Sequence, residues 1–367
     1  MTPAHHSEFQ VTLPLLTLVR GGMGGSETYA RELGRHLADV PGLEVRTAVA
    51  NAAAGFSEGV PEHVARAVGG GGSSLGRLRT QLQATVNRPL RRLLRTSDIV
   101  HYPLSVPVPR PPHTTPVVQT LLDVQHHDLK ELFTRAELAY RSLMYDRPAR
   151  RADAVITISE FSRQRIITHL GVSPSRVHVA HLGVDTSQFR VNRGDREEFV
   201  LYPARGWRHK NHARLIEAMH LVRQERPEVR LVLTGGALDN LGDLPPWVDK
   251  RGLVSRQELL ELYRRAACLA FPSRYEGFGL PPLEAMASGC PVAAADAGSL
   301  PEICGDAAVM FDPNDARAIA RAVLEALSSQ GRLLEAGLAR CRRFTWDACA
   351  QKHVDVYRSL VCPRRVG

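Results

Sequence analysis

The sequence predicts an α/β protein with two doubly wound parallel-sheet units in tandem. Its 367 residues suit two domains at about 150 residues each. Short apolar runs alternate with amphipathic stretches, which is the pattern of parallel strands joined by covering helices. The series occurs twice, and a connection near 183–198 separates the two runs. We therefore expect an N-terminal domain at 1–183, a second domain at 184–343 and a C-terminal helix in 344–367.

The expected elements follow the chain in order. In the first domain, a strand at 11–19 leads through a glycine-rich loop into a helix at about 26–37. Four further short β runs are expected there, at 45–49, 98–102, 116–122 and 154–158. The strands of the second domain are expected at 199–202, 230–233, 268–271 and 291–294, and its helices at 213–226, 258–267, 281–288 and 315–328. The last predicted helix covers 346–360.

Two segments depart from this alternation of strands and helices. Residues 52–74 are small and rich in glycine, which predicts a surface loop. Residues 75–95 carry six arginines, and their apolar residues recur at helical spacing. A surface helix with a solvated basic face is one interpretation, and peripheral contact with a membrane surface or an acceptor is the other. Pro89 predicts a kink in either case.

Charge and cysteine usage narrow the class of protein. The excess of 47 Lys+Arg over 38 Asp+Glu favours anionic partners but does not choose among them. No basic block is long enough for a nucleic-acid tail, so we expect no nucleic-acid partner. No apolar run approaches about 18 residues and the N-terminus lacks a basic leader, so we expect a cytoplasmic protein, with peripheral membrane association as an option. The six cysteines form no C-x-x-C pair and are expected to be reduced.

A glycine-rich loop joins the first strand to the first helix. Its Gly24 and Gly25 let backbone N–H groups approach an anion at a helix N-terminus. It is not a dinucleotide fingerprint, because a G-x-G-x-x-G frame from Gly22 would need glycine in place of Glu27. A tight structural turn is the alternative.

The segment YPARGWRHKN at 202–211 follows the first strand of the second domain. Ligands of doubly wound sheets bind at the carboxyl ends of strands, where this loop is expected. Arg205 and Lys210 can converge there on one diphosphate, the arginine as a fork and the lysine as a point charge. An ordinary surface loop is the alternative.

The segment EGFGLPPLE places two carboxylates, Glu276 and Glu284, on either side of a loop-to-helix junction. Gly277 and Gly279 free the backbone to wrap a ligand, and Pro281 suits a first helical turn. Each carboxylate can accept hydrogen bonds from sugar hydroxyls. The alternative for Glu284 is an acid favoured by the helix dipole.

The Glu276-x7-Glu284 segment, within PSRYEGFGLPPLEAMASGCPV, resembles the signature of retaining glycosyltransferases of the GT4 type, which have the GT-B fold. Four other segments agree in family order: GGMGGSETYARELG, ADAVITISEFSRQRI, HLGVDTSQF and YPARGWRHKN. The similarity runs from about residue 11 to 360. It implies two Rossmann-like domains facing a cleft, a nucleotide-sugar donor held mainly by the second, and a final helix that crosses back to the N-terminal domain.

The resemblance also implies a role for each matching residue. Arg205 and Lys210 would hold the diphosphate and stabilise the charge of the leaving group. Glu276 would bind hydroxyls of the donor sugar, and Glu284 those of the ribose. Further donor-binding positions would be Gly24, Gly25, Phe278, Gly279 and Leu280.

The reaction implied by the resemblance is a front-face displacement, in which a phosphate oxygen of the donor takes the acceptor proton. No D-x-D triplet occurs in the sequence, so we expect no metal ion or other cofactor to be required. One position departs from the family, because Leu122 stands where many relatives have a histidine before Asp123. His126, or secondly His127, could reach the donor sugar instead, and ordinary loop histidines are the alternative.

Three functions remain open at this point. The first is a glycosyltransferase that uses a GDP-mannose-like or UDP-sugar donor on a polysaccharide or lipid-linked precursor, or on a small natural product. The loop YPARGWRHKN resembles a subgroup rich in mannosyltransferases, which favours GDP-mannose. The second is a catalytically silent nucleotide-sugar-binding protein of the same fold, supported by Leu122. The third is an epimerase or a phosphorylase, although the sequence offers no phosphate or cofactor site for the latter.

Overall fold

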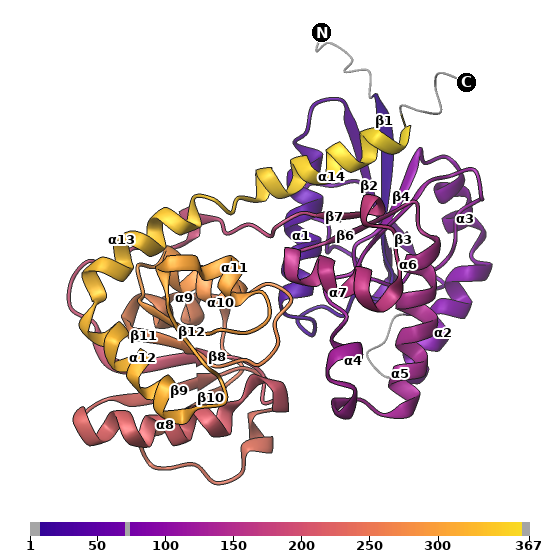
Figure 1. Cartoon of the computed structure of the whole chain (residues 1–367). Coiled ribbons are helices and arrows are strands. Elements are labelled where there is room, and N and C mark those ends of the chain that lie inside the picture. The colour runs from indigo at the N-terminus through magenta and orange to yellow at the C-terminus, as the bar shows by residue number, and fades with distance from the viewer. Residues whose placement is uncertain (1–7, 70–73, 362–367) are drawn as a thin grey trace. The chain divides into compact units, whose positions relative to one another are not determined.

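The computed structural model describes residues 8–69 and 74–361, which fall into two compact units (Figure 1). Unit 1 contains residues 1–182 and 346–367, and unit 2 contains residues 183–345. Unit 1 is therefore built from two separate stretches of chain, whereas unit 2 is continuous.

Unit 1 contains a seven-stranded parallel sheet with the order β3-β2-β1-β4-β5-β6-β7. Its strands are β1 Phe9–Leu15, β2 Leu43–Ala50, β3 Glu62–Ala65, β4 Ile99–Tyr102, β5 Val117–Thr120, β6 Ala154–Thr157 and β7 Val177–Val179. Its α-helices are α1 Gly25–Ala38, α2 Ser74–Val86, α3 Arg88–Arg95, α4 Gln125–Asp128, α5 Arg135–Arg141, α6 Arg147–Arg151, α7 Glu160–Leu170 and α14 Trp346–Val361. The central strands are buried on both faces, as expected for a covered parallel sheet.

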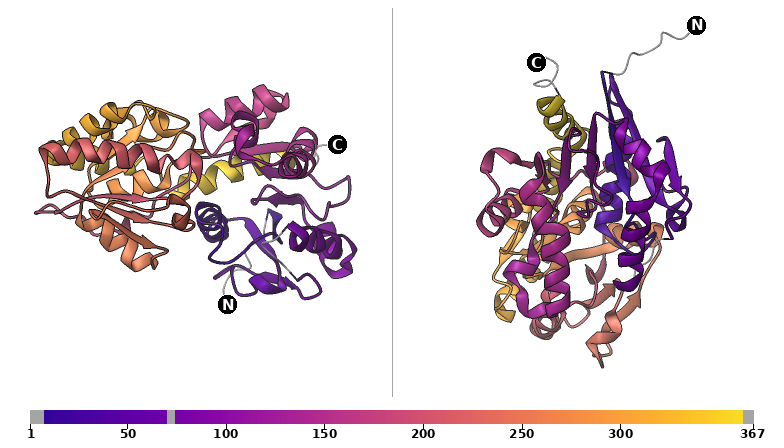
Figure 2. Two further views of the ribbon diagram at one scale, coloured as in Figure 1. Left: turned by 90° about the horizontal axis from the view of Figure 1, so that it is seen from below. Right: turned by 90° about the vertical axis from the view of Figure 1, so that its right-hand side faces the viewer.

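Unit 2 contains a six-stranded parallel sheet with the order β10-β9-β8-β11-β12-β13. Its strands are β8 Glu197–Pro203, β9 Arg230–Thr234, β10 Val248–Gly252, β11 Ala266–Phe271, β12 Val292–Ala295 and β13 Val309–Phe311. Its α-helices are α8 His212–Glu225, α9 Arg256–Arg265, α10 Leu280–Ala287, α11 Leu300–Cys304, α12 Ala316–Ser328 and α13 Gln330–Cys341. Helices α8 and α12 pack together, and α10 contacts α9 and α11, so helices cover both faces of the sheet (Figures 1 and 2). The expected α/β class is confirmed.

The segment 52–74 is more structured than its composition predicts. It contains the edge strand β3, which pairs with β2 from Thr47↔Glu62 to Ala50↔Ala65. Phe56 is buried in the core of unit 1. The prediction of a surface loop was wrong, because a four-residue edge strand in a glycine-rich segment carries too little periodicity to be seen. Residues 70–73 of this segment lie outside the described residues.

Pro89 has the expected effect on the basic segment. Helix α2 ends at Val86, and α3 begins at Arg88 with Pro89 in its first turn. The Asn87 side chain caps α3 by accepting a hydrogen bond from the Leu90 N–H at 2.9 Å. The five cysteines within the described residues are free and buried, and Cys362 lies outside them.

A buried polar network attaches α14 to the sheet of unit 1. His353 Nδ1 donates to the Cys349 carbonyl at 2.8 Å, so its Nε2 accepts from the Tyr29 hydroxyl of α1 at 2.9 Å. Tyr29 also contacts Thr120 of β5, at 2.9 Å. His101 of β4 contacts the Thr120 hydroxyl at 2.8 Å and the Tyr357 hydroxyl at 2.6 Å.

This network predicts a loss of stability in mild acid. Burial lowers the pKa of His353 from 6.5 to about 4, and burial lowers the pKa of His101 as well. Between pH 6.5 and 4 the unfolded chain takes up a proton at His353 that the folded chain excludes, so stability falls as the pH falls. At pH 5 the His353 contribution is about 2 kcal/mol. Urea unfolding at pH 8 and pH 5 measures this loss of stability. The H353Q variant should lose less stability than the wild type between these two pH values. An equal loss in H353Q and the wild type would contradict the assignment to His353.

Candidate active site

The site predicted in unit 2 is built from loops at the carboxyl ends of β8, β9 and β11. The loop after β8 lies against the loop after β9, since the Ala204 N–H donates to the Thr234 carbonyl at 2.8 Å and the Gly206 N–H to the Gly236 carbonyl at 3.0 Å. A Cβ on Gly206 would lie 2.1 Å from the Ala237 carbonyl oxygen. Backbone therefore packs directly on backbone here, and only glycine fits at position 206.

Lys210 is held at the end of the same loop. Its carbonyl accepts a hydrogen bond from the buried Tyr202 hydroxyl at 2.6 Å. The next residue, Asn211, adopts a left-handed conformation, and its side-chain amide donates to the carbonyls of Pro272 and Pro313 at 3.1 and 2.7 Å. These contacts fix the start of α8 and the position of the lysine backbone.

The structure brings Lys210 and Glu276 together. The Lys210 Nζ lies 2.5 Å from the Glu276 Oε1, and the two side chains are only 15% and 13% exposed. This pair joins the loops after β8 and β11, which are neighbouring strands. Arg205 lies in the same loop as Lys210, with its guanidinium 5.4 Å from the centre of the Trp207 ring. That Arg205 and Lys210 converge on one diphosphate stays a prediction.

The loop that carries Glu276 is fixed by the segment before α11. The Ser299 hydroxyl contacts the carbonyls of Phe278 and Glu276, at 2.6 and 3.1 Å. A Cβ on Gly298 would lie 2.8 Å from the Glu276 nitrogen, and Gly298 has a positive φ of 61°. The loop then turns at Gly279, with φ 119°, into α10, which starts at Leu280. Backbone N–H groups of a first helical turn have no partner within the helix and suit an anionic or hydroxyl ligand.

Glu284 lies in the second turn of α10, beyond the first turn in which the helix dipole most favours an acid. Its Oε1 is 2.6 Å from the Arg256 Nη1, and its Oε2 accepts from the Tyr263 hydroxyl at 2.9 Å. Burial and the adjacent carboxylate raise the pKa of Tyr263 well above its usual value, so the hydroxyl stays a donor. Neither Arg256 nor Tyr263 belongs to a sequence motif, so the sequence alone does not mark them as site residues.

Gly24 and Gly25 lie in unit 1, at the start of α1. Gly24 has φ 57° and precedes the helix, and its carbonyl accepts from the N–H groups of Glu27 and Thr28 at 2.9 and 3.2 Å. An L-side chain at Gly24 would be strained in this conformation. The loop therefore has the expected strand-to-helix geometry.

His126 is a buried residue of α4 and not a loop histidine. It is 2% exposed, and its Nε2 lies 3.0 Å from the Asp146 Oδ1. His127 Nε2 lies 2.9 Å from the other carboxylate oxygen. Burial alone would raise the pKa of Asp146, but hydrogen bonds from the two histidines outweigh it and hold that pKa below the usual value. A contact of His126 with a donor sugar stays a prediction, and Leu122 is half-buried just before α4.

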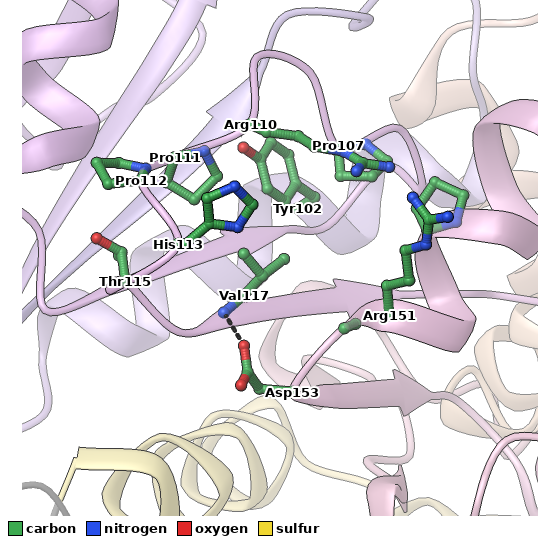
Figure 3. A pocket seen from close by; sticks show the side chains of 12 residues that line it. Tyr102, Pro107, Arg110, Pro111, Pro112, His113, Thr115, Val117, Arg151 and Asp153 are labelled. Atoms are coloured by element: carbon green, nitrogen blue, oxygen red, sulfur yellow. Dashed lines mark hydrogen bonds between the residues drawn. The ribbon is translucent and has the colours of Figure 1, made fainter.

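A separate pocket of about 500 Å³ lies in unit 1 (Figure 3). Val117 at the start of β5 and Asp153 just before β6 belong to its lining, and the Val117 N–H donates to the Asp153 carboxylate at 2.8 Å. Arg110 and Arg151 line it as well. It therefore lies toward the amino ends of these strands, and none of the predicted site residues lines it.

Comparisons with known proteins agree on one family. The model described as "Glycosyl transferases group 1" matches residues 184–340, and that described as "Glycosyltransferase Family 4" matches residues 23–188. O-antigen chain mannosyltransferase B of Escherichia coli is 29% identical over 66% of this chain and 70% of its own length. The MMP alpha-(1->4)-mannosyltransferase of Mycolicibacterium hassiacum is 32% identical over 59% of this chain, and the aligned part spans only 57% of that relative.

Solved structures show a similar fold at low identity. Sucrose-phosphate synthase from Thermosynechococcus elongatus has a TM-score of 0.76 and 21% identity, with 97% of this chain and 100% of that one covered. Anabaena HepE in complex with UDP and glucose has a TM-score of 0.72 and 19% identity, with 96% and 100% covered.

Proposed function

Because the chain belongs to the group 1 glycosyl transferases and has their GT-B fold, we propose that it transfers a sugar from a nucleotide-diphosphate sugar to an acceptor hydroxyl, with retention of configuration. The Lys210–Glu276 pair carries this proposal. The transfer needs a cation that neutralises the leaving diphosphate. It also needs a carboxylate that binds sugar hydroxyls. Both must lie at the carboxyl ends of the strands, where ligands of such sheets bind. These two side chains meet at that place, although 66 positions separate them.

The proposed reaction needs no nucleophile from the protein. The bond between the sugar carbon and the diphosphate breaks on the face that the acceptor oxygen approaches, and a phosphate oxygen of the donor takes the acceptor proton. Lys210 and Arg205 would stabilise the negative charge that develops on the diphosphate. Since these cations can supply that stabilisation, we propose that the transfer requires no metal ion. Glu276 would hold hydroxyls of the sugar, and Glu284, preoriented by Arg256 and Tyr263, those of the ribose.

The relatives favour a mannosyl donor. Several of the curated relatives carry the word mannosyltransferase in their names, which supports GDP-mannose as the first donor to test. UDP-glucose, seen in a complex of HepE, is the second. The acceptor would be a polysaccharide or lipid-linked precursor, or a small natural product.

Peripheral contact with a lipid surface is part of the proposal. Leu82 and Val86 of α2 are 63% and 73% exposed, and the following helix α3 exposes Arg88, Arg91, Arg92 and Arg95. Exposed apolar residues in one helix and exposed arginines in the next suit an anionic lipid surface that carries a lipid-linked acceptor. Among the described residues, no helix is long and apolar enough to cross a bilayer.

Thermal unfolding with nucleotides tests the donor site. GDP, UDP, ADP and dTDP are each added to the purified protein, with magnesium or with EDTA. We expect GDP to raise the unfolding midpoint equally in both conditions. At about 100 times its Kd, a ligand stabilises the folded state by about 2.7 kcal/mol. No shift with any diphosphate would contradict the donor site. A shift without turnover on any sugar donor would favour a silent nucleotide-sugar-binding protein, the alternative supported by Leu122.

A further inference from the structure

A compact cluster of His126, His127 and Asp146 lies in unit 1. The Nε2 atoms of the two histidines lie 3.0 and 2.9 Å from different oxygens of the Asp146 carboxylate. One ligand atom from each of the three residues lies within 4.8 Å of the others. His126 and Asp146 are 2% exposed, and the His127 side chain is 22% exposed, so one side of the cluster can be reached from solvent.

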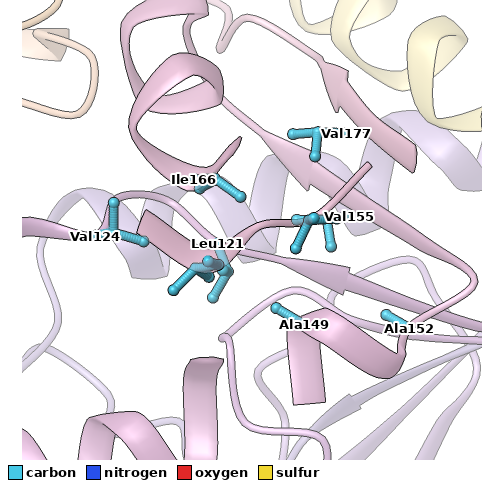
Figure 4. Close-up of a cluster of buried hydrophobic side chains, with 9 residues drawn as sticks. Leu121, Val124, Ala149, Ala152, Val155, Ile166 and Val177 are labelled. Atoms are coloured by element: carbon cyan, nitrogen blue, oxygen red, sulfur yellow. The ribbon is translucent and has the colours of Figure 1, made fainter. Parts of the chain in front are cut away.

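The fold holds both halves of this cluster rigidly. Leu121 and Val124 precede the two histidines in the sequence, and Ala149 follows Asp146. These three apolar residues belong to one buried core cluster (Figure 4). Asp146 is the last residue of the π-helical turn Ser142–Asp146. Single π-helical turns inside helices occur frequently at functional sites.

The buried Asp146 carboxylate relies on hydrogen bonds from the two imidazoles for compensation. Asp146 meets the two imidazoles, whereas the nearby acid Asp128 is paired with Arg165 and His169. A buried carboxylate is costly unless a cation or hydrogen bonds compensate it. In addition, the buried Nδ1 of His126 has no hydrogen-bond partner among the described residues.

We propose that His126, His127 and Asp146 bind one divalent transition-metal ion, with Zn²⁺ as the first candidate. Two imidazoles and one carboxylate form a donor set that Zn²⁺ uses, with water in the fourth position. Ligand arms of about 2.0–2.1 Å place ligand atoms of a tetrahedral site roughly 3.3 Å apart. The nitrogen–oxygen separations of 3.0 and 2.9 Å already come close to this spacing.

This ion has a role apart from the proposed transfer reaction. It would fix α4 to the π-helical turn of unit 1, whereas the diphosphate cations Arg205 and Lys210 belong to unit 2. A metal bound at His126 Nε2 occupies the nitrogen that faces Asp146, so that nitrogen could not also contact a donor sugar.

The test is metal binding to the full chain after removal of metal with EDTA. Co²⁺ is titrated and followed by its visible absorption, and Zn²⁺ is then titrated in competition. We expect one ion per chain at this site. The variant D146N removes the anionic ligand but keeps the side-chain shape. Loss of a supporting residue next to a metal site costs about 10–100-fold in affinity, so loss of this ligand should weaken binding by about 100-fold or more.

D128N is the matched control. It makes the same chemical change on a neighbouring acid that also contacts a histidine, and its metal affinity should equal that of the wild type. H127Q, on the more exposed ligand, should weaken binding as D146N does, and far-UV circular dichroism in EDTA shows whether each variant is folded. No Co²⁺ absorption in the wild type, or equal affinity in D146N and the wild type, would overturn the metal site. Because the readout is binding, it is independent of whether the protein transfers sugar.

Discussion

Replacement of Lys210 by alanine should lower kcat by about 100-fold, which corresponds to about 3 kcal/mol of lost transition-state stabilisation. The ammonium group is 2.5 Å from Glu276 in a site where both side chains are largely shielded from water. Its interaction with a developing diphosphate charge is therefore screened far less than at the surface. Turnover of GDP-mannose on a suitable acceptor is the measurement.

Lys250→Ala is the control for this prediction. Lys250 also lies in unit 2 and contacts a carboxylate, Asp239, at 2.8 Å, but that carboxylate is 96% exposed. Such surface pairs contribute about 0–1 kcal/mol to folding stability. Lys250 has no role in the proposed donor site, so kcat should be unchanged. Lys210→Ala also leaves Glu276 without this partner, and far-UV circular dichroism shows whether the variant stays folded. A Lys210→Ala enzyme with wild-type kcat would refute the proposed donor site.

The second large effect is expected for Gly206→Ala. The added methyl carbon would lie 2.1 Å from the Ala237 carbonyl oxygen, and backbone on both sides prevents a cheap adjustment. We expect a loss of about 3 kcal/mol in the free energy of unfolding, at the upper end of the usual cost of overpacking. Because Arg205 and Lys210 belong to this loop, nucleotide binding should weaken as well.

Gly236→Ala provides the matched comparison, since it makes the same change in the adjoining loop. A Cβ there meets only the ends of the Leu253 and Arg205 side chains, at 3.8 and 4.0 Å. Urea unfolding should show Gly236→Ala close to the wild type and Gly206→Ala clearly destabilised. Similar midpoints for the two variants would show that the two loops do not pack as described.

The elements of the donor site could be predicted because their signals are local. Charged residues and glycines that directly follow apolar strands mark loops at the carboxyl ends of a parallel sheet. The contact between Lys210 and Glu276 follows from this topology, because β8 and β11 are neighbours in the sheet.

Other features depend on packing and left no signal in the sequence. Asp146 is 20 positions from His126, and Arg256 is 28 positions from Glu284, and neither belongs to a repeated or spaced pattern. The strands β7, β10 and β13 were likewise not predicted, because β7 and β13 have only three residues each and β10, with the sequence VDKRG, has no apolar run. Such contacts and strands are set by the tertiary structure that surrounds them.

The division of unit 1 into two stretches of chain has a consequence for synthesis on the ribosome. All of unit 2 is translated between the sheet of unit 1 and α14, the helix that supplies His353 and Tyr357 to the buried polar network. Unit 2 can close on itself first, since its ends meet where the Val184 N–H donates to the Phe344 carbonyl at 3.0 Å. Until α14 is synthesised, Tyr29 and His101 lack their partners His353 and Tyr357. Unit 1 is therefore begun first and completed last.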